Sequence, residues 1–151
     1  MVMNIGDLNR AIRIAVEAHA FQFDKVGEPY ILHPLAVMGA MQTYEERIVA
    51  VLHDVVEDTD VTIDDIQDHG FSDDILRAVY AISKLPNETN RAYLARVKAN
   101  PLATKVKLAD IAHNAGRLDK LPRADEREYL TKKYREATAY LTDAADEGGG
   151  G

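Results

Sequence analysis

The sequence predicts an all-α protein built as one helical bundle. Apolar residues recur at the three- and four-residue spacing of helices, capping residues precede most of these segments, and no alternating strand pattern persists. A chain of 151 residues is long enough for one domain with a sizeable core but short for two, and it contains no interdomain linker. We therefore expect one domain over residues 1–146, followed by a flexible glycine-rich tail over residues 147–151.

The helices in the first half of the chain are predicted from caps and prolines. Asp7 is placed as the N-cap of the first helix. The KVGEPY stretch that follows combines glycine with proline and indicates a loop. Pro34 suits the first residue of the second helix, because proline has no N–H to satisfy there. A third helix is expected over residues 44–58, and Thr62 is placed as the cap of a short fourth helix.

The second half continues in the same way. Ser72 is expected to cap a helix with acidic residues in its first turn, where the helix dipole favours anions. The segment ETNRAYLARVKA is amphipathic, and Asn100 followed by Pro101 is a strong signal for the start of the next helix. Pro122 is expected to begin the last helix.

Composition excludes several classes of function. The net charge of −7 does not favour general binding to nucleic acids or to anionic membranes. Cysteine is absent, so disulfides, thiolate metal sites and cysteine nucleophiles are excluded. No apolar run approaches the length of a membrane span, and the N-terminus has no signal-peptide pattern. We expect a cytoplasmic protein.

The segment AVLHDVVEDTD, residues 50–60, combines apolar residues with a histidine and several carboxylates. On a helical wheel, His53, Glu57, Asp54 and Asp58 span about 140° along one edge, opposite the apolar face. A solvated polar face is one interpretation. Like charges four residues apart destabilise a helix, however, and a divalent cation would remove that penalty. One imidazole with several oxygens suits Mn²⁺, Fe²⁺, Zn²⁺ or Mg²⁺.

Two further candidate ligands lie elsewhere in the chain. His33 precedes Pro34 at a helix start, and Asp110 lies in the segment KVKLADIAHN with Asn114 one turn later. A histidine, then a His-Asp doublet, then a distant aspartate is the ligand order of the HD phosphohydrolases. The order in these contexts is far more specific than the doublet alone.

Four segments carry a more specific resemblance: GEPYILHP, VLHDVVEDTDVTIDDI, the phenylalanine at position 71 and VKLADIAHN. In this order they resemble the hydrolase domain of the RelA/SpoT alarmone enzymes, and in size the chain is most similar to the small alarmone hydrolases. The resemblance covers roughly residues 15–120. It implies a single HD-domain bundle without the synthetase domain of the long enzymes.

The resemblance also implies roles for individual residues. His33, His53, Asp54 and Asp110 would bind one divalent ion, most often Mn²⁺ in that family. Glu57 and Asp58 match a dyad that handles water and protons. The reaction would remove the 3′-diphosphate of guanosine tetra- or pentaphosphate as pyrophosphate, leaving GDP or GTP. Candidate contacts to this nucleotide are Lys25, Arg91, Lys107, Asn114, Arg117 and Tyr129, whereas Tyr30, His19 and His113 are expected to serve packing or structure.

Two departures from the family pattern fall on its base and ribose contacts. Asp24 stands where the family has an arginine that stacks on guanine, and Arg117 is shifted by one position. From the sequence alone, with the loop taken as exposed, Asp24→Arg is expected to lower KM and to leave kcat unchanged. The gain in substrate binding free energy is expected to be about 1 kcal/mol.

Other functions stay open at this point. One is an HD phosphohydrolase acting on another nucleotide or on pyrophosphorylated tRNA ends. Another is a non-enzymatic module that binds a partner such as a toxin synthetase. A homo-oligomer is also compatible with the sequence.

Overall fold

The computed structural model describes residues 5–143, and within them it confirms the all-α prediction, because the regular elements are helices. The loop over residues 19–31 contains one isolated bridge, between Phe23 and Pro29. The expected tail over 147–151 lies outside the described residues. The helices are α1 (Ile5–Ala18), α2 (Leu32–Gly39), α3 (Tyr44–Leu52), α4 (Val55–Asp58), α5 (Ile63–Asp68), α6 (Asp73–Ile82), α7 (Asn90–Lys98), α8 (Pro101–Ala115), the 3₁₀ turn η1 (Leu118–Lys120) and α9 (Ala124–Thr142).

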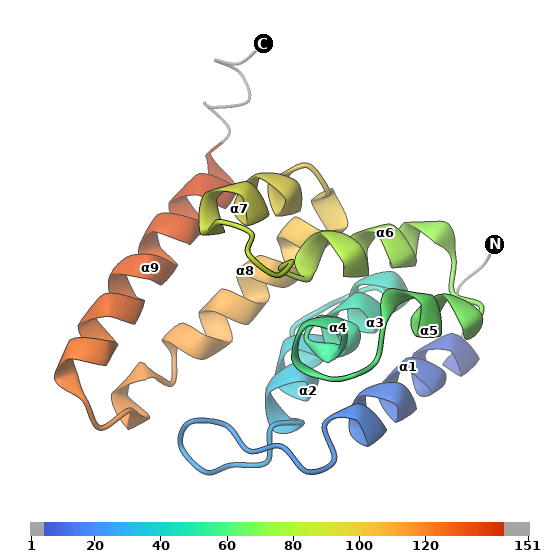
Figure 1. Ribbon diagram of the computed structural model, residues 1–151, viewed down its shortest axis with the longest axis horizontal. Helices are drawn as coiled ribbons and strands as arrows, with labels where there is room; N and C mark the ends of the chain where they lie inside the picture. Colours follow the sequence, from blue (N-terminus) through green and yellow to red (C-terminus); the bar gives the residue numbers. More distant parts are fainter. Residues whose placement is uncertain (1–4, 144–151) are drawn as a thin grey trace.

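The bundle is organised around α3 and α8 (Figure 1). Helix α3 packs against α1 and α2 on one side and against α8 and α6 on the other. Its residues Ile48–Leu52 are completely buried, which explains why the second half of this helix is apolar on all sides. Helix α8 also contacts α7 and α9, so it joins the two halves of the molecule. Side chains from α2, α3 and α8 can therefore meet in the interior.

Helix starts follow the predicted capping chemistry at several positions. Thr62 forms a full capping box, in which its hydroxyl accepts from the N–H of Asp65 and the Asp65 carboxylate accepts in return. Ser72 and Asn100 also cap their helices through side-chain oxygens. These bonds satisfy N–H groups that have no partner within the helix.

Three predicted boundaries were wrong by a few residues. Helix α1 begins at Ile5, so Asp7 lies in its first turn, where the carboxylate binds Arg10 at 2.6 Å. Helix α2 begins at Leu32, which places Pro34 third in the helix; proline is tolerated there because the first N–H groups of a helix are unpaired anyway. The last helix begins at Ala124, two residues after the proline that was expected to start it.

The predicted continuous helix over residues 44–58 is broken at His53 and Asp54. The buried His53 ring places Nδ1 2.5 Å from the carbonyl oxygen of Ala50, the acceptor that residue 54 would use in a continuous helix. Asp54 adopts φ −103° and ψ −2°, and the short helix α4 follows. The wheel therefore misplaced Glu57 and Asp58 relative to His53, although all of these residues still face one region.

Among the described residues, no helix has the length and apolar character required to cross a membrane.

Candidate metal centre

Four predicted ligands, separated by up to 77 positions in the chain, converge in the interior. His33 comes from the first turn of α2, His53 and Asp54 from the break after α3, and Asp110 from α8. One donor atom from each residue lies within 4.8 Å of the other three. His33 Nε2 lies 2.7 Å from Asp110 Oδ1, and His53 Nε2 lies 3.0 Å from Asp54 Oδ2. The structure thus brings these four side chains together at one place.

The spacing and chemistry of this cluster fit a divalent ion. Ligands about 2.1 Å from a metal are separated from one another by roughly 3 to 4.2 Å in tetrahedral or octahedral geometry, and the donor pairs here lie 2.7, 3.0, 3.3 and 3.8 Å apart. Two imidazoles and two carboxylates also form a mixed donor set that first-row metals accept. Burial alone would lower the pKa of His53, but the nearby Asp54 and Asp110 charges raise it overall. A bound divalent cation would compensate the same two carboxylate charges.

Each histidine of the cluster has a partner at its other ring nitrogen. His53 Nδ1 lies 2.5 Å from the Ala50 carbonyl oxygen and donates its N–H to it, so with a metal ion bound the Nε2 lone pair would be free to act as a ligand. His33 Nδ1 lies 2.7 Å from Nδ1 of His113, and the two rings stack with centroids 4.9 Å apart. For Nε2 of His33 to bind a metal, its Nδ1 must carry the proton, and Nδ1 of His113 must then accept a hydrogen bond from it.

His113 was expected only to be structural, and the structure shows that it supports one residue in particular, His33. It lies one turn from Asp110 on α8, and its ring is stacked on a candidate ligand. Its pKa is lowered by burial and by His33 and Arg117, which favours the neutral ring that can accept from His33. The spacing from Asp110 to His113, the i,i+3 spacing that places two residues on one helix face, was the sequence signal that could have identified this contact.

We expect His113→Ala to weaken metal affinity by about 10- to 100-fold, because His33 would lose the partner that fixes its tautomer and ring orientation. Metal analysis after dialysis against a graded chelator series measures this change. His69→Ala, which removes an exposed histidine at the end of α5, is the matched control and should retain the metal as the wild type does. Equal retention by both variants would contradict the orienting role.

The two carboxylates of the cluster are also held from outside. Asp110 Oδ2 accepts from Lys107 Nζ at 3.0 Å, and its Oδ1 accepts from Asn114 Nδ2 at 3.2 Å. Burial raises the pKa of Asp110, but Lys107 and His53 outweigh burial and hold it well below its usual range. The Tyr30 hydroxyl donates a hydrogen bond to Asp54 Oδ2 at 2.5 Å. Tyr30 was expected only to pack the loop, so its contact with a candidate ligand corrects that interpretation.

Asp54 and Asp110 of the cluster line a hollow, which we call the metal hollow; Glu57 and Asp58 line it too but lie outside the four-ligand group. Glu57 Oε1 accepts the backbone N–H of Lys84 at 2.8 Å. Asp58 Oδ2 lies 3.4 Å from the Tyr30 hydroxyl. Partial burial in the cleft, with the Asp54 and Glu57 charges, raises the pKa of Asp58 to about 6. A carboxylate with that pKa can exchange protons near neutral pH.

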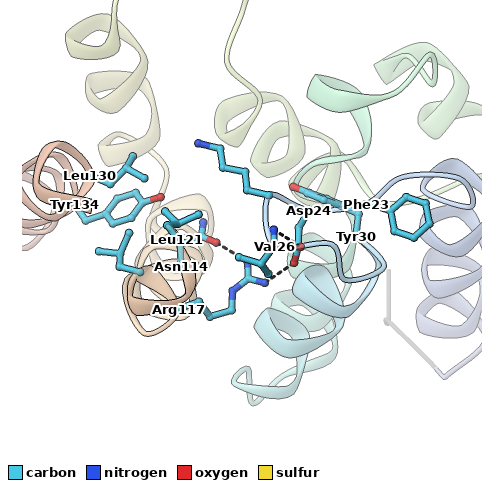
Figure 2. A pocket seen from close by; sticks show the side chains of 11 residues that line it. Phe23, Asp24, Val26, Tyr30, Asn114, Arg117, Leu121, Leu130 and Tyr134 are labelled. Carbon is cyan, nitrogen blue, oxygen red and sulfur yellow. Dashed lines mark hydrogen bonds and ion pairs between the residues drawn. The ribbon is translucent and has the colours of Figure 1, made fainter. Parts of the chain in front are cut away.

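An apolar pocket of about 280 Å³ adjoins this hollow and shares Tyr30, Asn114 and Tyr134 with it. Figure 2 shows Tyr134 and Leu130 of α9 on one side and the loop that carries Asp24 and Val26 on the other. Its volume is near the lower end for small-molecule sites, ~300 Å³. An apolar wall with a few polar groups suits a planar ring such as a nucleobase.

Asp24 and Arg117, the two residues that depart from the family pattern, form an ion pair at this pocket. Asp24 Oδ2 accepts from Arg117 Nη1 at 2.9 Å, and Arg117 Nη2 donates to Asn114 Oδ1 at 3.0 Å (Figure 2). Asp24 Oδ1 also accepts the backbone N–H groups of Val26 and Glu28. The Asp24 side chain is only 9% exposed, so the expectation of an exposed, screened loop position was wrong. Partial burial raises its pKa, but these hydrogen bonds and Arg117 lower it overall.

The other predicted nucleotide contacts fall in different places. Lys25 is exposed at the edge of the apolar pocket, and its ammonium lies 3.8 Å from Glu126. Lys107 reaches the metal hollow but is already paired with Asp110. Arg91 and Tyr129 line a groove that adjoins that hollow, but they do not line the hollow itself. Tyr129 is 65% exposed and lies outside the core.

Sequence comparison places this chain beside long bacterial enzymes. It is 31% identical over 147 residues to the guanosine-3′,5′-bis(diphosphate) 3′-pyrophosphohydrolase of Aquifex aeolicus, covering 89% of this chain and 21% of that protein. It is 33% identical over 144 residues to the bifunctional (p)ppGpp synthase/hydrolase SpoT of Escherichia coli K12, covering 85% and 20%. The chain belongs to the RelA/SpoT-type HD-domain family. It spans about a fifth of the length of these curated relatives.

A solved structure agrees on the fold of this RelA/SpoT-type domain. A metazoan ortholog of SpoT, described as hydrolysing ppGpp, superposes with a TM-score of 0.78 at 20% identity, over 95% of this chain and 89% of that chain. No family model matches the sequence.

Proposed function

We propose that this chain is a metal-dependent pyrophosphohydrolase that removes the 3′-diphosphate of guanosine tetra- or pentaphosphate. The observation that carries the proposal is the cluster of His33, His53, Asp54 and Asp110, whose two carboxylates line the same hollow as Glu57 and Asp58. The names of the bacterial relatives support this substrate class. Mn²⁺ is the ion we propose, because the family resemblance implies it and because the mixed imidazole and carboxylate donor set is compatible with it.

The residues divide the chemistry between them. When bound, the ion supplies Lewis-acid polarisation of a phosphoryl oxygen and a water of lowered pKa. Asp58 takes a proton from the attacking water, for which its pKa of about 6 is suited. The water oxygen bonds to the phosphorus next to the ribose, the bond from that phosphorus to the 3′-oxygen breaks, and a proton passes to this oxygen. The products are then a 3′-hydroxyl nucleotide and pyrophosphate.

The test is a panel of nucleotides incubated with the metal-loaded protein, with the released phosphate species identified. Guanosine tetraphosphate should yield GDP and pyrophosphate in equal amounts. Release of orthophosphate instead would indicate a different phosphohydrolase, and no turnover of any nucleotide would favour a binding module. Pyrophosphorylated tRNA and other phosphorylated nucleotides belong in the panel, because the base-side contacts differ from the family pattern at Asp24 and Arg117.

The Asp24–Arg117 ion pair leads to a revised prediction for the base-side pocket. Asp24→Arg would place two guanidinium groups together and remove the acceptor of two backbone N–H groups, so we expect KM to rise about tenfold rather than fall. The scale follows from hydrogen bonds to charged groups, about 1.5–3 kcal/mol. Steady-state kinetics on the best substrate of the panel measure this.

The charge-reversed double variant Asp24→Arg/Arg117→Asp is the matched control for this pair. It restores opposite charges in the same place and should reverse part of the increase in KM. A lowered KM for the single variant would show that the ion pair does not hold the pocket together and would return support to the sequence-based expectation.

A further inference from the structure

A cationic groove of about 660 Å³ lies beside the metal hollow, on α7, α9 and the loop before α7. We define it by its four cations, Lys84, Arg91, Lys132 and Lys133. Glu136 is the one carboxylate among its lining residues. Within residues 5–143 none of the four cations is ion-paired with a carboxylate. Four unpaired cations on one concave surface generate a local positive potential in a chain whose net charge is −7.

The groove is continuous with the candidate active site. Lys84, Asn90 and Lys133 line both the groove and the metal hollow. The backbone N–H of Lys84 also donates to Glu57, which fixes the edge of the groove against the candidate dyad. Partial burial lowers the pKa of Lys133, and the neighbouring cations Lys107, Lys84 and Lys25 lower it further, which outweighs the opposite effect of Glu57.

The three spaces differ in the chemistry that they offer. The apolar pocket shares Tyr30, Asn114 and Tyr134 with the metal hollow, whereas the groove shares Lys84, Asn90, Leu94, Lys133 and Ala137 with it. Tyr30 and Asn114, which lead to the apolar pocket, do not line the groove. The hollow is therefore flanked by an apolar space that suits a ring and by a cationic space that suits anions.

We propose that the cationic groove is the subsite for the terminal phosphate of the diphosphate that is cleaved. A nucleoside ring in the apolar pocket and its first phosphate at the metal cluster leave the second phosphate pointing away from the nucleoside, toward the groove. The groove thereby selects a diphosphate over a monophosphate at the cleaved position and holds pyrophosphate after cleavage. This inference rests on the proposed function for the identity of the substrate, but the binding of pyrophosphate can be measured without turnover.

The test is calorimetric titration of the metal-loaded protein with inorganic pyrophosphate and with orthophosphate. The variant is Arg91→Gln/Lys132→Gln, which removes two exposed cations that line the groove but not the metal hollow. We expect pyrophosphate to bind the wild type more tightly than orthophosphate does, and the variant to bind pyrophosphate about tenfold more weakly, with the difference shrinking as salt is raised. Metal content must be equal in all samples.

Arg135→Gln is the matched control, because Arg135 is an exposed cation of α9 that does not line the groove. It should bind pyrophosphate as the wild type does. Equal pyrophosphate affinity in the wild type and the groove variant would overturn the proposal, as would equal affinity of the wild type for the two anions. If the groove variant instead loses affinity for a single-stranded RNA oligonucleotide while it retains pyrophosphate, the groove binds nucleic acid and the proposal is wrong.

The outcome is separable from that of the proposed function. If guanosine tetraphosphate is not hydrolysed but the groove variant loses pyrophosphate affinity, the subsite stands and the nucleotide assignment falls. The opposite outcome is that both proteins hydrolyse the nucleotide and prefer the 3′-diphosphate over the 3′-monophosphate analogue by the same ratio of rates. In that case the enzyme assignment stands and the subsite falls.

Discussion

Replacing His53 or Asp54 with alanine will remove both bound metal and activity. Each residue supplies one of four donor atoms that lie within 4.8 Å of one another, and the remaining three cannot hold the ion in the same closed geometry. Removing either also leaves buried charges uncompensated around Asp110, whose side chain is 8% exposed. Metal analysis of the purified variants and the nucleotide assay measure the two losses together.

A thermal readout checks the same site without relying on turnover. A ligand present at about a thousand times its dissociation constant stabilises the folded state by about 4 kcal/mol. We therefore expect chelation to lower the Tm of the wild type by roughly 10 °C. The Tm of Asp54→Ala should respond little to chelator, because it has no metal to lose.

Asp68→Ala removes an exposed carboxylate of α5 and should behave as the wild type in these metal and thermal assays. Full activity of a chelated, metal-free wild-type sample would sink the metal assignment.

Replacing Glu57 with glutamine or Asp58 with asparagine should reduce turnover by about 10² or more, the scale of general acid–base catalysis. Both carboxylates line the hollow yet lie outside the ligand cluster, so the metal content should be almost unchanged. Rapid-mixing or steady-state turnover and metal analysis on the same samples give the two numbers. Loss of the ion in either variant would show that these residues are ligands and that the assigned roles are wrong.

The pH profile distinguishes a proton-transfer role of Asp58 from a purely structural one. The pKa of Asp58 is raised to about 6, and the carboxylate must be deprotonated to accept a proton from water. Activity should therefore rise as the pH increases through about 6 and fall as the pH decreases through it. Asp58→Asn should lose this limb together with most of its rate. Glu128→Gln, which removes an exposed carboxylate of α9, should keep both the rate and the limb.

Much of this protein follows from local sequence signals. Thr62, Ser72 and Asn100 cap their helices as predicted, because an N-cap bond spans only two or three residues and needs no tertiary partner. The four candidate ligands were predicted because their order along the chain resembles the ligand order of the HD phosphohydrolases, and their mixed imidazole and carboxylate donors suit a divalent ion. The apolar pattern also predicted the all-α class.

What only the tertiary structure decided concerns contacts between distant segments. The break after α3 depends on burial of the His53 ring, which takes the Ala50 carbonyl from the helix, and helical periodicity cannot show this competition. The Asp24–Arg117 pair joins residues 93 positions apart, so an aspartate that looked like a loss of base recognition proved to be the partner of the shifted arginine. Lys84, in the loop before α7, and Lys133, on α9, became candidates for phosphate binding because the packing of α7 against α9 places both side chains along the metal hollow. Side-chain charge is written in the sequence, but the distance between charges, which sets their interaction, is fixed only by the packing of the helices.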